Sequence, residues 1–158
     1  MTSDEIKSIV AEAERLDDRE KFDKAIDLYN QLIEGGHGSA KVVALRGYSR
    51  FRKGDYEGAI KDFSEALSTK PSASTTWFFR ARAKEHIGDL DGALFDYNES
   101  AKLDPTRADV FMNSGLIEKY RGHFEQARTY FKRAVEVDPQ CTVALNSLRE
   151  IERKLREA

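Results

Sequence analysis

The sequence has little cysteine, little proline and no long apolar run. Cys141 is the only cysteine among 158 residues, so no internal disulfide can form, which is typical of a reducing compartment. No apolar run approaches the roughly 20 residues that a membrane-spanning helix needs. The first residues, MTSDEIK, contain no apolar signal segment. We therefore expect a cytoplasmic protein that does not bind a membrane.

The chain also lacks an excess of charge of one sign. Its 26 Lys and Arg residues are balanced by 28 Asp and Glu residues, which gives a net charge of −2. A general nucleic-acid binder shows a basic excess instead. Nine Phe and six Tyr supply too many apolar anchors for a disordered chain, and only three prolines interrupt it. These counts favour a folded chain with room for long helices.

One alanine returns every 34 positions along the chain. A large apolar residue precedes it by three positions and an aromatic follows it by four, so all three lie on one face of a helix. A small residue between two bulky ones lets a neighbouring helix approach closely. The four alanines and their aromatic partners are Ala25 and Tyr29, Ala59 and Phe63, Ala93 and Tyr97, and Ala127 and Phe131. Four copies at a fixed period predict four stacked copies of one structural unit.

Each 34-residue frame is predicted to hold a first helix, a short turn and a second helix. Glycine suits the left-handed residue that ends a helix, and the turns of the last three frames carry Gly54, Gly88 and Gly122. Asp55 and Asp89 follow two of these glycines and are candidate N-caps of the second helices. Thr106 is expected to cap the first helix of the fourth frame. Proline, which cannot continue a helix, closes the last three frames at Pro71, Pro105 and Pro139.

This pattern resembles the tetratricopeptide repeat. That family has a bulky residue at the fourth position, a small one at the eighth, alanine at the twentieth, an aromatic at the twenty-fourth, a small residue at the twenty-seventh and proline at the thirty-second. In the fourth frame these positions hold Phe111, Gly115, Ala127, Phe131, Ala134 and Pro139. The resemblance implies an all-α fold, a right-handed α-solenoid of four helix-turn-helix repeats at about 6–39, 40–73, 74–107 and 108–141.

The two ends of the chain depart from this pattern. The first frame has Glu20 in place of the turn glycine and His37 in place of proline, so we expect its glycine-rich exit to be the loosest joint. A last helix at about 142–157 is expected to cap the stack, which makes 1–158 a single domain. Its apolar stripe, which could instead form a dimer seam, consists of Leu145, Leu148, Ile151 and Leu155.

In this family the first helices line the concave side of the solenoid, where side chains are free to contact a ligand. Here the middle of that side is aromatic and basic, and these residue types dominate binding hot spots. The candidate peptide-binding residues are Tyr48, Phe51, Arg52, Phe78, Phe79, Arg82, His86, Met112, Asn113 and Leu116. Phe51 and Phe79 could instead fill the seam with the next frame, and Met112 and Leu116 could cover the last helix.

The resemblance implies an adaptor that binds a peptide segment of a partner protein. We expect the peptide to be extended or a short helix and to carry apolar and acidic residues. Its carboxylates would pair with Arg52 and Arg82. Its apolar side chains would contact Tyr48, Phe78, Met112 and Leu116.

A more specific family function is not supported by the residues. Some members bind the C-terminal carboxylates of heat-shock chaperones through a five-residue clamp of Lys, Asn and Arg. No register of the frames supplies this set, and from the first frame its positions hold Val10, Glu14, Leu45, Thr75 and Phe79. A co-chaperone-type adaptor without the clamp is one alternative to a general adaptor.

Other classes of function find less support. His37, His86 and His123 lie in different frames without metal-ligand spacing, so we expect no catalytic residue, no metal and no cofactor. An RNA-binding helical repeat is a second alternative, in which Arg52 and Arg82 contact phosphates and Tyr48 stacks on bases. The net charge argues against it. Self-association, with the terminal helix of another copy in the groove, is a third; we expect a monomer.

Overall fold

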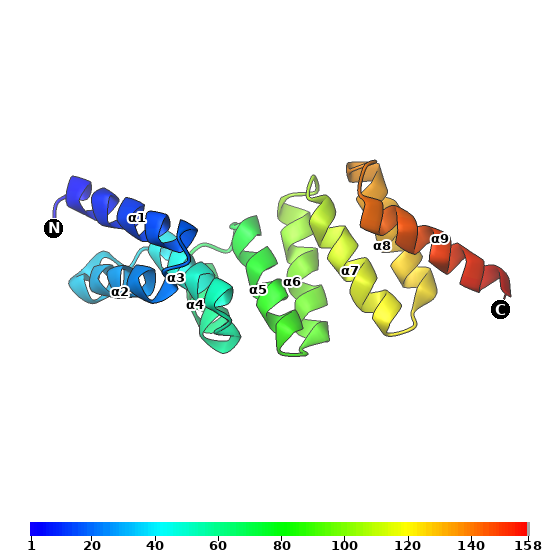
Figure 1. Cartoon of the computed structure of the whole chain (residues 1–158), viewed down its shortest axis with the longest axis horizontal. Coiled ribbons are helices and arrows are strands. Elements are labelled where there is room, and N and C mark those ends of the chain that lie inside the picture. Colours follow the sequence, from blue (N-terminus) through cyan, green and yellow to red (C-terminus); the bar gives the residue numbers. More distant parts are fainter. Residues whose placement is uncertain (158) are drawn as a thin grey trace.

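The computed structural model describes residues 1–157, and this part of the chain contains nine α-helices and no strand. A π-helical turn, η1 (Ile33–His37), follows α2. The helices pack in chain order as an elongated row with the two termini at opposite ends (Figure 1). The predicted α-solenoid of helical repeats is therefore confirmed. The α-helices are α1 (Ser3–Asp18), α2 (Phe22–Leu32), α3 (Ala40–Lys53), α4 (Tyr56–Thr69), α5 (Ser74–His86), α6 (Leu90–Leu103), α7 (Ala108–Tyr120), α8 (Phe124–Val137) and α9 (Thr142–Glu157).

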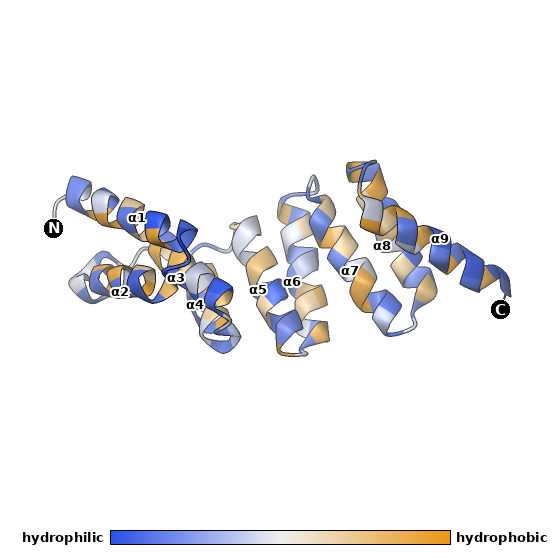
Figure 2. Cartoon of the chain, in the orientation of Figure 1, coloured by the Kyte–Doolittle hydropathy of each residue, from blue (hydrophilic) through white to orange (hydrophobic). Residues whose placement is uncertain are grey.

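The residues that recur at the 34-residue period form the core. All four recurring alanines are fully buried, and so are the four aromatics that follow them. The helices in Figure 2 mix hydrophobic and hydrophilic segments, as expected of helices that bury only one face. The predicted contact face of the second helices is thus confirmed.

The helix ends follow the sequence prediction with one exception. Gly54, Gly88 and Gly122 have positive φ angles of 91°, 83° and 78°. The side chains of Asp55 and Asp89 accept hydrogen bonds from backbone N–H groups in the first turns of α4 and α6.

The exception is Thr106, whose predicted role as an N-cap is wrong. Arg107 occupies the N-cap position of α7 and makes no side-chain cap bond. The Thr106 hydroxyl instead donates to Asp104 Oδ1 at 2.6 Å, and its backbone N–H donates to the same oxygen. Aspartate just before a turn competes for local donors in this way, which draws Thr106 away from the helix.

The first and second frames are joined by apolar packing. Glu20 adopts the left-handed conformation, with φ at 57°, where the other frames have glycine. Leu32 of α2 and Val42 of α3 are buried in one cluster on either side of the η1 turn. The glycine-rich exit therefore does not separate the first two frames.

At the other end of the row, α9 packs on α8. Ala144 and Ile151 are fully buried in the cluster that contains Phe131, and Leu148 and Leu155 are partly buried against it. The apolar stripe of α9 is therefore used within the chain, as predicted for a capping helix.

The small residue of the first helix and the aromatic residue of the second helix alternate from frame to frame between two combinations, which are alanine with tyrosine and glycine with phenylalanine. A Cβ atom placed on Gly47 would lie 2.9 Å from the Phe63 ring, and one on Gly115 would lie 2.7 Å from the Phe131 ring. In the first and third frames alanine takes the place of glycine, and tyrosine takes the place of phenylalanine. The two phenylalanine frames therefore bring their paired helices into contact over glycine.

The tyrosine hydroxyls face an acidic residue of their own frame. Tyr97 Oη donates to Glu85 Oε2 at 2.8 Å, and burial together with Glu85 raises the pKa of Tyr97. In the first frame the equivalent residues are Tyr29 and Asp17. Both are buried, yet within residues 1–157 neither Tyr29 Oη nor Asp17 Oδ1 has a hydrogen-bond partner. Asp17 is one methylene shorter than Glu85, and its other carboxylate oxygen, Oδ2, accepts a hydrogen bond from Ser49 Oγ at 2.6 Å.

We expect Asp17→Glu to raise the free energy of unfolding by about 1 kcal/mol, because the longer side chain supplies the acceptor that Tyr29 lacks. The reverse change in the third frame, Glu85→Asp, is expected to lower it by about the same amount, since it leaves Tyr97 Oη unpaired. Urea denaturation followed by circular dichroism measures both. A loss of stability in Asp17→Glu would show that the missing acceptor is not what limits this site.

Two arginine–aspartate pairs join the helices of the middle frames. Arg46 donates two hydrogen bonds to Asp62, at 2.9 and 2.7 Å, and Arg80 donates two to Asp96, at 2.7 and 2.8 Å. Both aspartates are fully buried. The same arginines also reach the second helix of the preceding frame, where they donate to Asn30 and Ser64. Each pair therefore fixes a helix hairpin and its joint with the previous hairpin.

Candidate functional site

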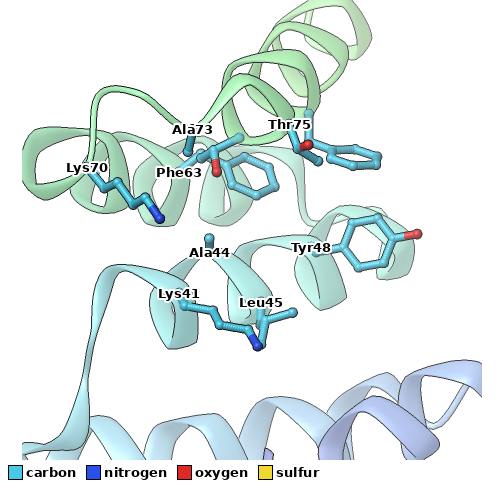
Figure 3. A pocket seen from close by; sticks show the side chains of 10 residues that line it. Lys41, Ala44, Leu45, Tyr48, Phe63, Lys70, Ala73 and Thr75 are labelled. Carbon is cyan, nitrogen blue, oxygen red and sulfur yellow. The ribbon is translucent and has the colours of Figure 1, made fainter. Parts of the chain in front are cut away.

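A groove of about 510 Å³ lies where the second frame meets the third (Figure 3). It opens between the first helices of these frames, α3 and α5, and its floor comes from α4 and the loop after it. No acidic residue lines it. The lining residues are Lys41, Ala44, Leu45, Tyr48, Phe63, Lys70, Ala73, Thr75, Thr76 and Phe79.

Helical spacing and small side chains account for the hollow. The α3 residues of the lining follow the spacing i, i+3, i+4, i+7, so they share one face of the helix. Ala44 and Ala73 are small, and they leave space above the buried ring of Phe63 (Figure 3). A larger residue at either alanine would fill the space that a ligand needs.

An aromatic cluster forms one wall of the groove. The Phe79 ring lies 4.8 Å from the Tyr48 ring, 5.7 Å from the Phe51 ring and 6.4 Å from the Phe63 ring, measured between centroids. Tyr48 and Phe79 are half-buried, so each presents part of its ring to the groove. Such edge-on and stacked rings hold one another in place. The wall is therefore preorganised for an apolar side chain.

The described residues contain neither a candidate metal site nor a candidate membrane span. Within residues 1–157 no group of three or more His, Cys, Asp or Glu side chains is arranged to hold a metal ion. In the same part of the chain no helix combines the length and apolarity that crossing a membrane requires.

Comparison with known proteins decides the family. Two family models described as tetratricopeptide repeat match residues 44–108 and 108–141. The chain belongs to the tetratricopeptide repeat family. This family is a non-catalytic protein-interaction fold, and the repeats form a protein–protein interaction module. A search of curated proteins finds no match.

Solved tetratricopeptide repeat structures share the fold. MamA superposes with a TM-score of 0.88 at 14% identity, covering 96% of this chain and 83% of its own. YrrB, described as having an unusual peptide-binding site, gives 0.81 at 19% identity, covering 91% and 74%. The first repeat domain of Spaghetti (RPAP3), bound to the HSP90 peptide SRMEEVD, gives 0.70 at 24% identity, covering 75% and 94%. At these identities the likeness shows the fold alone.

The repeats bring only some of the predicted site residues together. Tyr48 and Phe79 line the groove, and Phe51 packs against Phe79 beside it. The guanidinium of Arg82 lies 5.8 Å from the Phe51 ring centre. The exposed ring of His86 stacks on Tyr56 at 4.2 Å, beyond the groove lining. Two of the ten predicted residues, Tyr48 and Phe79, are therefore part of the groove lining.

Phe78, another predicted ligand contact, lies in the core and does not line the groove. Its side chain is only 5% exposed and packs with Tyr97, Val110 and Ile117. The Arg107 guanidinium covers the ring at 4.1 Å. A phenylalanine at this position is long enough to reach the next repeat and fill the seam, so little of the ring is left for a peptide.

Four other predicted residues serve packing or internal contacts. Arg52 Nη1 donates to the Asp17 carbonyl oxygen at 2.8 Å, and its guanidinium lies 4.9 Å from the Phe22 ring centre, so it faces the first repeat. Asn113 is buried. Met112 and Leu116 pack against the cluster beneath α9, which is the structural role that the sequence left open.

Some lining residues were not among the predicted site residues. Lys41, Ala44, Leu45 and Thr75 lie at concave positions of the repeat, but small, aliphatic and flexible side chains give no hot-spot signal. Lys70 lies in the loop after α4, and no helical period reports on a loop.

Proposed function

We propose that this tetratricopeptide repeat protein is an adaptor that binds a peptide segment of a partner protein in the groove between its second and third repeats. The observation that carries the proposal is the open apolar groove of about 510 Å³ with its aromatic wall. Partly buried aromatic side chains in a concave setting are typical of binding hot spots. The peptide lies along α3 and α5 and places a large apolar side chain against Tyr48 and Phe79.

Two features support an extended peptide as the ligand. The groove lies between the first helices α3 and α5, and its α3 lining runs over two helical turns from Lys41 to Tyr48, which suits a chain segment. YrrB and the Spaghetti (RPAP3) domain, which share the fold, are described with a peptide-binding site and a bound peptide, respectively.

Filling the groove tests the proposal. Ala44→Phe places a ring in the hollow without removing any lining side chain. We expect it to weaken binding of peptides selected from a random display library by about tenfold or more, which corresponds to about 1.4 kcal/mol. Isothermal titration calorimetry measures the dissociation constants of the selected peptides.

Ala101→Phe is the matched control. Ala101 lines a separate hollow of about 480 Å³ between α6 and α8, together with Phe95 and Phe111. The same substitution there is expected to leave peptide affinity unchanged. Equal affinity of both variants for every selected peptide, or failure to select any peptide, would contradict the proposed function.

A further inference from the structure

The two ends of the groove differ in charge. Lys41, near the start of α3, and Lys70, directly after α4, both line it. Both side chains are exposed, and neither forms an ion pair with any carboxylate of residues 1–157. In Figure 3 Lys70 lies at the left of the groove, the Lys41 side chain extends beneath it toward Leu45, and the Tyr48 ring lies at the right. One end is therefore cationic and the other aromatic.

Several lysines elsewhere in the structure have carboxylate partners. Lys84 pairs with Asp96 at 2.9 Å, Lys102 pairs with Glu99 at 2.5 Å, and Lys119 pairs with Glu150 at 2.5 Å. The two groove lysines are unlike these because nothing among their described neighbours neutralises them. Their positive charge is available to a ligand.

The helix starts beside the groove add no negative charge. The first turns of α3 and α5 contain no acidic residue. The corresponding first helices of the outer repeats, α1 and α7, have Asp4, Glu5 and Asp109 in their first turns. The acidic residues usual at this position are thus absent from the two helices that flank the groove.

We infer that the groove selects a peptide in which an acidic residue lies close to a large apolar one. The apolar side chain packs against Leu45, Tyr48 and Phe79, and the carboxylate pairs with Lys41 and Lys70. This inference rests on the proposed function and names the ligand of the same groove. It also moves the carboxylate contact away from Arg52, whose guanidinium is engaged with the first repeat.

The physical basis is complementarity of charge beside an apolar anchor. Apolar burial supplies affinity at the aromatic end. Carboxylate–ammonium contacts at the exposed end contribute less but discriminate strongly, because a like charge placed there is repelled. A basic residue beside the apolar anchor is therefore disfavoured.

Three series of synthetic peptides test the inference. The peptides are identical except at the residues that flank a central leucine, which are Glu, Gln or Lys. Fluorescence anisotropy of the labelled peptides gives their dissociation constants. We expect the Glu series to bind the unaltered protein about tenfold or more tighter than the Lys series, with Gln between them.

A charge-reversed variant and a matched control complete the experiment. Lys41→Glu with Lys70→Glu is expected to invert the order of the series. Lys61→Glu with Lys132→Glu makes the same change of net charge at exposed lysines that do not line the groove, and is expected to keep the order. Circular dichroism confirms that both variants remain folded.

The outcomes separate the inference from the proposed function. Equal binding of the Glu and Lys series, or an order that survives Lys41→Glu with Lys70→Glu, overturns the inference. The proposed function still holds in that case if Ala44→Phe weakens binding. If no series binds, or if Ala44→Phe has no effect, the proposed function fails and the inference fails with it.

Discussion

Asp96→Ala is expected to lower the free energy of unfolding by about 3–5 kcal/mol, because it leaves two partly buried cations without a carboxylate. The Asp96 side chain is fully buried and accepts hydrogen bonds from Arg80 Nε and Nη2, and Lys84 Nζ lies 2.9 Å from it. Arg80 and Lys84 are themselves only 14% and 17% exposed. Water therefore cannot take over the role of the lost carboxylate.

Asp91→Ala is the matched control for this prediction. Asp91 also lies in α6 and also pairs with an arginine, Arg121, at 2.8 Å, but its side chain is 90% exposed. We expect its loss to cost less than about 1 kcal/mol, as is usual for exposed ion pairs. Equilibrium urea denaturation of both variants measures the difference. Similar losses in the two variants would contradict the claim that burial sets the strength of the Asp96 pair.

The Arg80–Asp96 ion pair also affects the proposed binding groove. Arg80 joins its own hairpin to Ser64 of α4, and α4 supplies Phe63 to the groove floor. The buried ion pair therefore helps to fix the relative position of the second and third repeats. Peptide affinity in the proposed groove depends on this joint, so a weakened joint should also weaken binding.

The fold could be predicted from the sequence because each repeat solves the same packing problem. Ala93 and Tyr97 are fully buried, as Ala59 and Phe63 are, so their shared spacing alone indicates the contact face. The sequence also indicated where the backbone needs a left-handed residue, since the predicted turn glycine Gly88 has a positive φ. The Thr106 cap failed because one neighbouring aspartate competed for its donors.

The candidate site was less predictable because it depends on what each side chain meets across a joint. Ala44 and Phe78 occupy the same position of successive repeats, yet one leaves a hollow and the other fills the core. Side-chain length decides between these outcomes, and the 34-residue period gives no information about the side chain at this position. Arg52 was assigned to a ligand, but the carbonyl oxygen of Asp17, in the preceding repeat, accepts its hydrogen bond.

Phe131→Ala is expected to cost about 3–5 kcal/mol, because it removes a fully buried ring and leaves a cavity between three helices. The Phe131 ring lies in α8, packs over Gly115 of α7 and belongs to the cluster that buries Ala144 and Ile151 of α9. The glycine lets the helices approach so closely that they have little freedom to collapse further. We therefore expect the capping helix α9 to detach more readily.

Phe95→Ala tests whether position rather than residue type sets this cost. Phe95 is also a phenylalanine in a second helix, but 56% of it is exposed, and its ring meets Trp77 only edge-on at 6.1 Å. We expect a cost of about 0.5 kcal/mol or less, as for most surface substitutions. Chemical denaturation gives both values, and hydrogen exchange of α9 amides reports its detachment. If Phe131→Ala leaves α9 as protected as before, the cap is held by its own contacts and not by the aromatic ring of the last repeat.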